Sequence, residues 1–409
     1  MKTYQFKLYQ HRRNRHLHRV INAASRIYNH CIALHKRYYR LFGKHLNKNK
    51  LQKHIAKLRN KNEYWRASKA CQSCGALAPV SAELTRTLSG FATTNYAEWR
   101  CVGSQAVQDI TDRIERAYQL FFKHHKKGVK PPNFRKRIKY KSFTLKQAGY
   151  KFLDSNCLKI GKRIYKFWKS REIKGKIKTV TIKRNPLGEL FVFVVTDYVG
   201  NHVSIASGKS AGFDFGCKIF LTCSEGFEVK SPLFFKQSLK ELKLASRNYS
   251  RKKKGSNGRE KARKHLVRVH EKVANRRRDW FWKLAHELTD KFDYLFFETL
   301  NLKGMKRLWG RKISDLALAE LLAIIDFVAA KKGKVVSYID RWYPSSKQCS
   351  ECHQVVDELP LNVRYWICPN PACNARHGRD SNASKNIKRA GSLSLGLDSV
   401  RQSQTATVA

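Results

Sequence analysis

The sequence has few acidic residues, with 30 Asp and Glu against 84 Lys and Arg among 409 residues, for a formal net charge of +54 at pH 7. A chain this basic repels itself and favours a polyanion as a standing partner. Neutralisation would take on the order of fifty phosphates, which exceeds a short DNA footprint. We therefore expect a long nucleic acid, an RNA together with DNA. A generally solvated basic surface is the alternative, although such surfaces seldom reach this excess.

We expect neither an export signal nor a membrane span. Its first residues have no apolar core of the kind that secretion signals contain. The most apolar run, residues 316–330, is shorter than the roughly 20 residues of a span and carries two acids, so it predicts a buried helix. Eleven cysteines without a secretory segment favour a reducing cytoplasm, where disulfides are rare.

Four cysteines form two close pairs near the C-terminal end, with C-x2-C, fifteen residues, and then C-x4-C. The four are Cys349, Cys352, Cys368 and Cys373. This spacing fits a tetrahedral Zn²⁺ ion held by four thiolates. Two disulfides or free thiols are the weaker alternative in a reducing compartment. His353 and His377 are replacement ligands if one cysteine is displaced.

A second cysteine group lies earlier in the chain, at Cys71, Cys74 and Cys101. A lone C-x2-C pattern is weak evidence for zinc, and no fourth ligand is apparent. Free thiols are the favoured interpretation. The segment from residue 66 to residue 99 looks like an insertion.

The first half of the chain changes its periodicity several times. Residues 3–9 alternate like a strand, whereas residues 17–60 and 105–125 have the pattern of helices. Residues 134–199 predict short, basic strands that form a small barrel or sheet.

His16 and His18 flank an apolar residue, and a tyrosine lies nearby, as in transposases that nick single strands with a metal ion. That arrangement needs a strand, and this pair opens a helical run. Two histidines at positions i and i+2 do not share a helix face, so simple phosphate contacts are favoured.

A basic helical hairpin is predicted over residues 236–288, with its turn at residues 254–258. Two clusters in it are suited to following a nucleic-acid backbone. They are Arg251, Lys252, Lys253 and Lys254, and Arg276, Arg277 and Arg278.

Three acids lie on different predicted elements. Asp214 interrupts an apolar strand, Glu298 ends the strand at 294–297, and Asp380 opens a helix that reaches about residue 389. Hard oxygen ligands from separate elements suit Mg²⁺ or Mn²⁺. Asp340 also ends a strand and remains a competitor. No serine elbow or phosphate-binding glycine loop is present, which argues against covalent catalysis and an ATPase.

Several runs resemble one family in their order and joint presence. They are GFDFG, FETLNLKGM, YPSSKQCSEC and RDSNASKNI. The chain resembles the TnpB (OrfB) proteins of bacterial insertion sequences, which are relatives of type V CRISPR effectors. The resemblance implies a multidomain α/β fold, with an RNase-H-like (RuvC) nuclease domain, an inserted zinc ribbon, a β-barrel wedge domain and a helical recognition domain.

The resemblance also assigns roles. It makes Asp214, Glu298 and Asp380 catalytic, and it makes the four paired cysteines zinc ligands. Two departures are Gly378, where the family often has Asp, and the wide second cysteine pair. The implied boundaries are 1–16 for a wedge strand, 17–128 for the recognition domain, 129–204 for the wedge barrel, 205–343 for the nuclease domain, 344–377 for the ribbon, 378–391 for the last nuclease helix and 392–409 for a disordered tail.

The implied function is that of a transposon-encoded, RNA-guided endonuclease in the prokaryotic cytoplasm. It would use a guide RNA to cut double-stranded DNA beside a short motif by metal-dependent phosphodiester hydrolysis, which links it to DNA recombination. A transposase is a candidate partner, and no membrane is expected. The alternatives are a nuclease-silent RNA-guided repressor, an RNA-binding scaffold, and a transposase or its accessory protein.

Overall fold

A computed structural model describes residues 1–60, 96–153, 156–199, 207–216 and 218–397 of the chain. The chain divides into two compact units, Met1–Val199 and Gly200–Ala409. Among the described residues, no helix is both long enough and apolar enough to cross a membrane.

The helices of the first unit are those predicted from periodicity. They are α1 (Arg15–Phe42), α2 (Lys48–Asn60) and α5 (Ser104–His124). Apolar residues recur every three or four positions along α1 and α5, so each helix buries one face. Helix α1 ends at Gly43, whose positive φ of 60° suits a residue without a Cβ atom.

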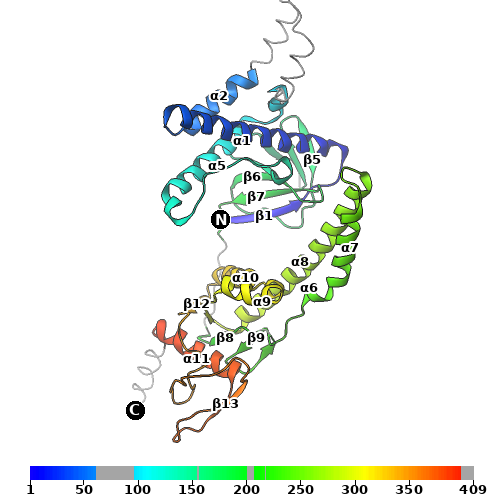
Figure 1. The fold of residues 1–409 in the computed structure, drawn as a ribbon. Coiled ribbons are helices and arrows are strands. Elements are labelled where there is room, and N and C mark those ends of the chain that lie inside the picture. Colours follow the sequence, from blue (N-terminus) through cyan, green and yellow to red (C-terminus); the bar gives the residue numbers. More distant parts are fainter. Residues whose placement is uncertain (61–95, 154–155, 200–206, 217, 398–409) are drawn as a thin grey trace, which may run out of the picture. The chain divides into compact units, whose positions relative to one another are not determined.

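Two antiparallel sheets share the core of this unit with the helices (Figure 1). One has the order β1-β7-β6-β2 and the other the order β3-β4-β5, and an isolated bridge between Leu8 and Phe167 joins the ends of β1 and β5. The strands are β1 (Lys2–Lys7), β2 (Ser142–Leu145), β3 (Tyr150–Leu153), β4 (Cys157–Ile160), β5 (Arg163–Lys166), β6 (Ile177–Arg184) and β7 (Leu190–Thr196).

The end of the segment expected to be inserted belongs to this core. Trp99 lies in the short 3-10 helix Tyr96–Cys101 and is fully buried. Cys71, Cys74 and the rest of residues 66–95 lie outside the described residues.

The second unit is built on a five-stranded sheet with the order β10-β9-β8-β11-β12. Its strands are β8 (Ser210–Asp214), β9 (Leu221–Cys223), β10 (Glu228–Val229), β11 (Tyr294–Glu298) and β12 (Val335–Ile339). Strands β8, β11 and β12 are parallel, whereas β9 and β10 are antiparallel. The carboxyl ends of the three parallel strands therefore meet at one edge.

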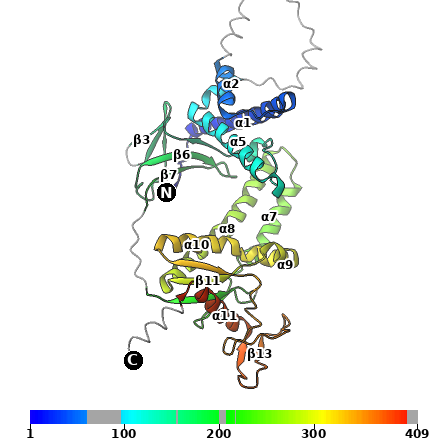
Figure 2. The same ribbon diagram turned by 90° about the vertical axis from the view of Figure 1, so that its left-hand side faces the viewer.

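Helices cover both faces of this sheet (Figure 2). On one face, Phe213 and Phe297 pack into a core with α8 (Asn257–Lys291) and α10 (Leu318–Lys332). On the other face, α11 (Arg379–Ser394) packs through Ile387 against β11 and β12.

The predicted basic hairpin is formed by α7 (Leu239–Arg251) and α8, and a single-turn helix α6 (Phe234–Gln237) precedes it. Helix α9 (Leu302–Leu316) was not predicted. Asn301 is its N-cap residue, and the side chain of Asn301 accepts a hydrogen bond from the backbone N–H of Gly304. Ala317, at a positive φ of 47°, separates α9 from the expected apolar helix α10.

The sequence predicted disorder from residue 392 onward, and this prediction was wrong for residues 392–394. Helix α11 continues to Ser394, because Gly391 lets the helix lie directly against the ring of Phe296 and Ser392 is buried. Residues 398–409 lie outside the described part of the chain.

Candidate metal sites

Two of the three predicted acids end neighbouring parallel strands at the same level. Phe213 of β8 is paired with Phe297 of β11, so Asp214 and Glu298 follow side by side. Side chains alternate along a strand, and strands in a sheet lie about 4.8 Å apart. The rings of Phe213 and Phe297 stack on each other, with centroids 5.1 Å apart, on one face. Asp214 and Glu298 therefore lie on the opposite face.

Helix α11 delivers the third acid to that face. Asp380 is in its first turn, and positions 384, 387 and 391 lie on the same side of the helix because they follow at helical spacing. A Cβ atom added to Gly212 would lie only 2.8 Å from the Cα atom of Lys388. Gly212 thus allows the helix backbone to contact β8, two residues before Asp214.

The three carboxylates interact electrostatically. Burial, and then the negative charges of Asp380 and Glu298, raise the pKa of Asp214 to about 7. Burial also raises the pKa of Glu298. A cation would stabilise the ionised form of these buried, mutually repelling carboxylates. Three carboxylate groups supply oxygen donors of the kind that suit Mg²⁺ or Mn²⁺.

A cation from the protein already contacts one of these acids. Arg364 donates a hydrogen bond from Nη1 to Oδ1 of Asp380 over 3.1 Å. The carboxylate oxygens are less closely gathered than the cysteine sulfurs, which form the only group of three or more candidate ligands within 4.8 Å among the described residues.

Asp340, the competing acid, has a different role. Its Oδ1 atom accepts a hydrogen bond from the backbone N–H of Trp342 over 2.7 Å, and its side chain is exposed. This is the geometry of an Asx turn, in which the carboxylate fixes a loop.

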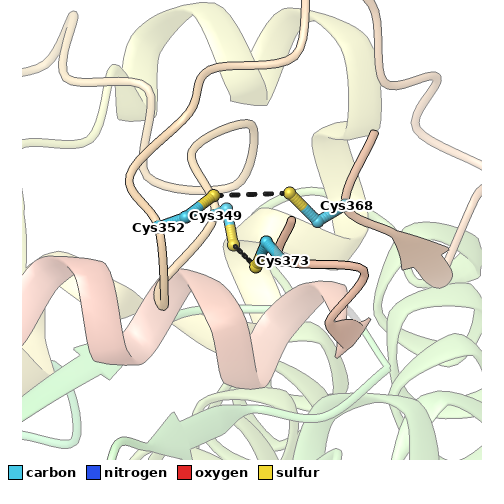
Figure 3. Close-up of side chains that lie close together, drawn as sticks. All are labelled: Cys349, Cys352, Cys368 and Cys373. Atoms are coloured by element: carbon cyan, nitrogen blue, oxygen red, sulfur yellow. Dashed lines mark hydrogen bonds between the residues drawn. The ribbon is translucent and has the colours of Figure 1, made fainter. Parts of the chain in front are cut away.

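The four paired cysteines converge as predicted (Figure 3). The sulfur atoms of Cys349 and Cys373 are 3.8 Å apart, and those of Cys352 and Cys368 are 3.5 Å apart. These distances exclude disulfide bonds. Four sulfurs about 2.3 Å from a tetrahedral zinc ion would be about 3.8 Å from each other, so the group fits Zn²⁺.

The wide second pair closes through a turn. The backbone N–H of Cys373 donates to the carbonyl of Asn370 over 2.9 Å, which brings Cys373 back to the other sulfurs. In both pairs the residue after the second cysteine has a positive φ, 66° at His353 and 45° at Asn374. The backbone therefore adopts the same left-handed conformation directly after each cysteine pair.

Neither histidine near the ribbon replaces a cysteine. His377 is buried, and its Nε2 atom lies 3.1 Å from the sulfur of Cys349, in hydrogen-bonding contact. The Nδ1 atom of His353 is buried without a hydrogen-bond partner in the described part of the chain.

Two buried asparagines, which the sequence reasoning missed, attach α11 to the first knuckle. Asn382 accepts a hydrogen bond from the backbone N–H of Ser350 and donates one to the carbonyl of Gln348. Asn386 donates to the carbonyls of Ser345 and Gln348, over 2.8 and 2.6 Å. Their i, i+4 spacing on a helix after the ribbon was the available signal. The ribbon therefore fixes the helix that carries Asp380.

The two predicted basic clusters differ in their surroundings. The side chains of Arg251, Lys252, Lys253 and Lys254 are all exposed where α7 turns into α8. In the second cluster, Arg277 and Arg278 form ion pairs with Glu320 of α10, and Arg276 lies over the ring of Phe234. The first cluster is thus open to a ligand, whereas the second is occupied by protein groups.

The histidine pair near the N-terminus does not converge on one point. His16 contacts the hydroxyl of Tyr165 over 3.0 Å, and the Nδ1 atom of His18 lies 3.5 Å from Arg184. Both histidines lie on α1, and burial lowers the pKa of each.

Comparisons with known proteins agree with this architecture. Residues 196–308 match the OrfB family described as "Probable transposase", and residues 319–387 match the Cas12f1-like TNB domain. A solved Cas12f1–sgRNA–target DNA complex aligns over 95% of this chain and 98% of the Cas12f1 chain, with a TM-score of 0.50 and 14% sequence identity. The chain therefore has the fold of the Cas12f1 class.

The OrfB family match and the named relatives confirm the resemblance to TnpB (OrfB) proteins. A protein of Streptomyces pristinaespiralis named "Putative RNA-guided DNA endonuclease" is 36% identical over 215 residues, which are 52% of each chain. Another, "Putative RNA-guided DNA endonuclease InsQ" of Escherichia coli, is 26% identical over 321 residues, 73% of this chain and 77% of the relative. This chain thus spans about half the length of the first relative and about three quarters of the second.

Proposed function

We propose that this protein is an RNA-guided DNA endonuclease with an RNase-H-like (RuvC) nuclease domain, which hydrolyses phosphodiester bonds with bound divalent metal ions. One observation carries the proposal: Asp214, Glu298 and Asp380 come from β8, β11 and α11 to one edge of the sheet. Carboxylates that two strands and a helix bring to one edge of a sheet are suited to hold metal ions on a phosphodiester.

The protein holds the three carboxylates in position and supplies their negative charge. Strands β8 and β11 fix Asp214 and Glu298, while the ribbon fixes α11 and with it Asp380. When bound, the metal ions would activate water and stabilise the departing oxygen. Asp214, whose pKa is about 7, must lose its proton before it can serve as a ligand, so binding of the ions should strengthen as the pH rises through 7.

The proposed partners are a guide RNA and double-stranded target DNA. A net charge of +54 and the open cluster at Arg251, Lys252, Lys253 and Lys254 support a polyanionic partner. The names of the relatives, and the sgRNA and target DNA in the solved Cas12f1 complex, support RNA and DNA in particular. The site of action would be the cytoplasm of a prokaryotic cell that carries the encoding transposon.

The test begins with the RNA that purifies with the full-length protein. Sequencing should find one abundant species with a variable end. The RNA-bound protein is then mixed with Mg²⁺ and plasmid DNA that matches this end, placed beside a randomised flank. We expect cleavage, and surviving flanks should be depleted of one short motif.

The substitution Asp214→Asn should lower the cleavage rate by about 100-fold or more, because metal ions supply several kcal/mol to the transition state and each 1.36 kcal/mol is tenfold. Asp279→Asn is the matched control, since Asp279 is exposed on α8 and, within the described residues, its ion pair is with Lys283 alone. Equal cleavage by Asp214→Asn and Asp279→Asn would refute the proposal. A random mixture of RNA would favour an RNA-binding scaffold.

A further inference from the structure

A pocket of about 440 Å³ lies inside the first unit, where the N-terminal ends of α1 and α5 meet two turns. One turn joins β2 to β3 and the other joins β4 to β5, and the backbone N–H of Gly161 in the second donates to the carbonyl of Gly149 in the first. A Cβ atom added to Gly103, at the start of α5, would have no atom within 4 Å, so this side of the pocket is open space. The volume is typical of small-molecule and cofactor sites.

The inner wall of this pocket is apolar. Val20, Phe143 and Leu145 line it and are buried in the core of the unit, and Ile160 lines it from β4. Apolar side chains in a concave site favour a ligand with an apolar body, such as a planar ring. A small inorganic ion would make no use of this wall.

Two polar side chains lie beside the apolar wall. The Nδ1 atom of His16 is 3.0 Å from the hydroxyl of the buried Tyr165, which holds the imidazole ring in place. Burial, and then the charges of Arg163 and Arg19, lower the pKa of His16, so the ring is neutral at pH 7. Gln105 has no hydrogen-bond partner within the ranges that the structure describes, and its amide offers two donors and an acceptor. These groups suit a ring whose edge carries donors and acceptors, as the nucleic-acid bases do.

The exposed side of the pocket is positively charged. Lys162 and Arg163 lie where the turn enters β5, and both are exposed. Neither has an ion-pair or hydrogen-bond partner in the described part of the chain, where no acidic residue lines the pocket. Arg100 adds a third positive charge, and its Nε atom donates to the carbonyl of Arg59. Two cations without partners beside an apolar wall favour a ligand that also carries an anionic group, such as a phosphate.

We propose that this pocket binds a single nucleotide, with the base against Phe143 and Leu145 and the phosphate on Lys162 and Arg163. This site goes beyond the proposed nuclease function and does not depend on it. A purely apolar ligand would leave the two cations without a partner, and a bare anion would leave the apolar wall uncovered, whereas a nucleotide satisfies both. A free nucleotide and an unstacked nucleotide of the bound RNA share this chemistry, and two experiments distinguish these sources.

The first experiment adds free nucleotides to the full-length protein with its copurified RNA. Isothermal titration calorimetry is carried out with the monophosphates of adenosine, guanosine, cytidine and uridine, with the matching nucleosides, and with inorganic phosphate. At least one monophosphate should bind with a dissociation constant on the order of 10–100 μM, as expected for a ligand of this size. Its nucleoside and inorganic phosphate should each bind about tenfold more weakly or worse, because each contacts only one part of the pocket.

The second experiment tests the RNA as the source. The complex as purified is irradiated with ultraviolet light and digested with ribonuclease and trypsin, and peptides that carry a nucleotide are identified by mass spectrometry. A base in the pocket should crosslink to CVGSQAVQDITDR, residues 101–113, or to SFTLK, residues 142–146, which contain the lining residues Cys101 and Phe143. A crosslink in these peptides without calorimetric binding identifies the RNA as the source, and binding without a crosslink identifies a free nucleotide.

Four variants separate the pocket from the rest of the basic surface. Ala148→Trp, in the exposed turn between β2 and β3, places an indole ring at the pocket and should remove both signals, whereas Ala56→Trp, at an exposed position of α2, should keep them. Lys162→Ala should weaken binding of the monophosphate, or lower the crosslink yield, by about tenfold and leave the nucleoside unaffected, because it removes a charge-assisted contact to the phosphate. Lys159→Ala is its control, since Lys159 is exposed on β4 and does not line the pocket. All four should melt at the temperature of the unaltered protein.

Three results would overturn the nucleotide pocket. The first is the absence of both a calorimetric signal and a crosslink in the two peptides. The second is equal behaviour of Ala148→Trp and Ala56→Trp, which would place the binding elsewhere. The third is inorganic phosphate that binds as tightly as the monophosphates, because the apolar wall would then have no part in binding. None of these results bears on cleavage, which Asp214→Asn tests separately.

Discussion

Replacing Gly212 with alanine tests how closely α11 must lie against β8. The added Cβ atom would be 2.8 Å from the Cα atom of Lys388 and closer still to the carbonyl oxygen of Ser384. Ordinary contacts lie at 3.4–4 Å, and both obstacles are backbone atoms that cannot rotate away. The helix must therefore move by something on the order of 1 Å, at a cost of about 1–3 kcal/mol.

Two measurements follow from that displacement. The melting temperature of the second unit should fall by about 2–4 °C for each kcal/mol of destabilisation. Cleavage of matched DNA should slow by up to about 100-fold, because Asp380 moves with the helix and a misplacement of about 1 Å can cost that much. Bound zinc should stay constant, since the four cysteines lie on the ribbon.

Gly310→Ala is the matched control. Gly310 lies in α9 with nothing within 4 Å of an added Cβ atom. Alanine there should stabilise the helix by about 0.5–1 kcal/mol and leave cleavage unchanged. If Gly212→Ala were as stable and as active as Gly310→Ala, α11 would not be what positions Asp380, and the reasoning would be refuted.

Three further predictions concern protons, zinc and charge. Because the folded pKa of Asp214 is about 7 and its ordinary value is 3.8, the metal-free protein should lose stability as pH rises through this window, and Asp214→Asn should lose less. Thermal melts from pH 4 to 8 check this, and parallel curves would contradict it. Cys352→Ser should lose bound zinc, measured by mass spectrometry, and lower the melting temperature of the second unit; full zinc content would contradict the four-cysteine site. Alanine at Lys252, Lys253 and Lys254 should reduce the salt slope of duplex DNA binding by about 0.9 for each phosphate that the turn no longer binds, and an unchanged slope would show that the turn binds no DNA.

Much of the second unit could be predicted from sequence because its signals are local. The apolar run before Glu298 indicated β11, and the spacing of the four cysteines indicated the metal cluster. The meeting of Asp214 with Glu298 follows once β8 and β11 are known to be parallel neighbours, since the carboxyl ends of parallel strands lie at one edge.

The rest depended on contacts between distant residues. Arg277 and Arg278 have the sequence of a nucleic-acid contact, yet Glu320, more than forty positions away, pairs with both. The end of α11 was missed because small and polar residues such as Gly391 and Ser392 carry no apolar pattern. Only the ring of Phe296, on another element, explains why the helix continues there.

The central claim is that Asp214, Glu298 and Asp380 share one cation. A crystal of the protein soaked in Mn²⁺, with data collected at the manganese absorption edge, tests it most directly. We predict an anomalous peak in contact with oxygens of all three carboxylates, at about 2.1 Å, a distance of the kind Mg²⁺ ligands adopt. Manganese bound elsewhere, with Asp380 still held by Arg364 and its oxygens remote from the other two acids, would contradict the account.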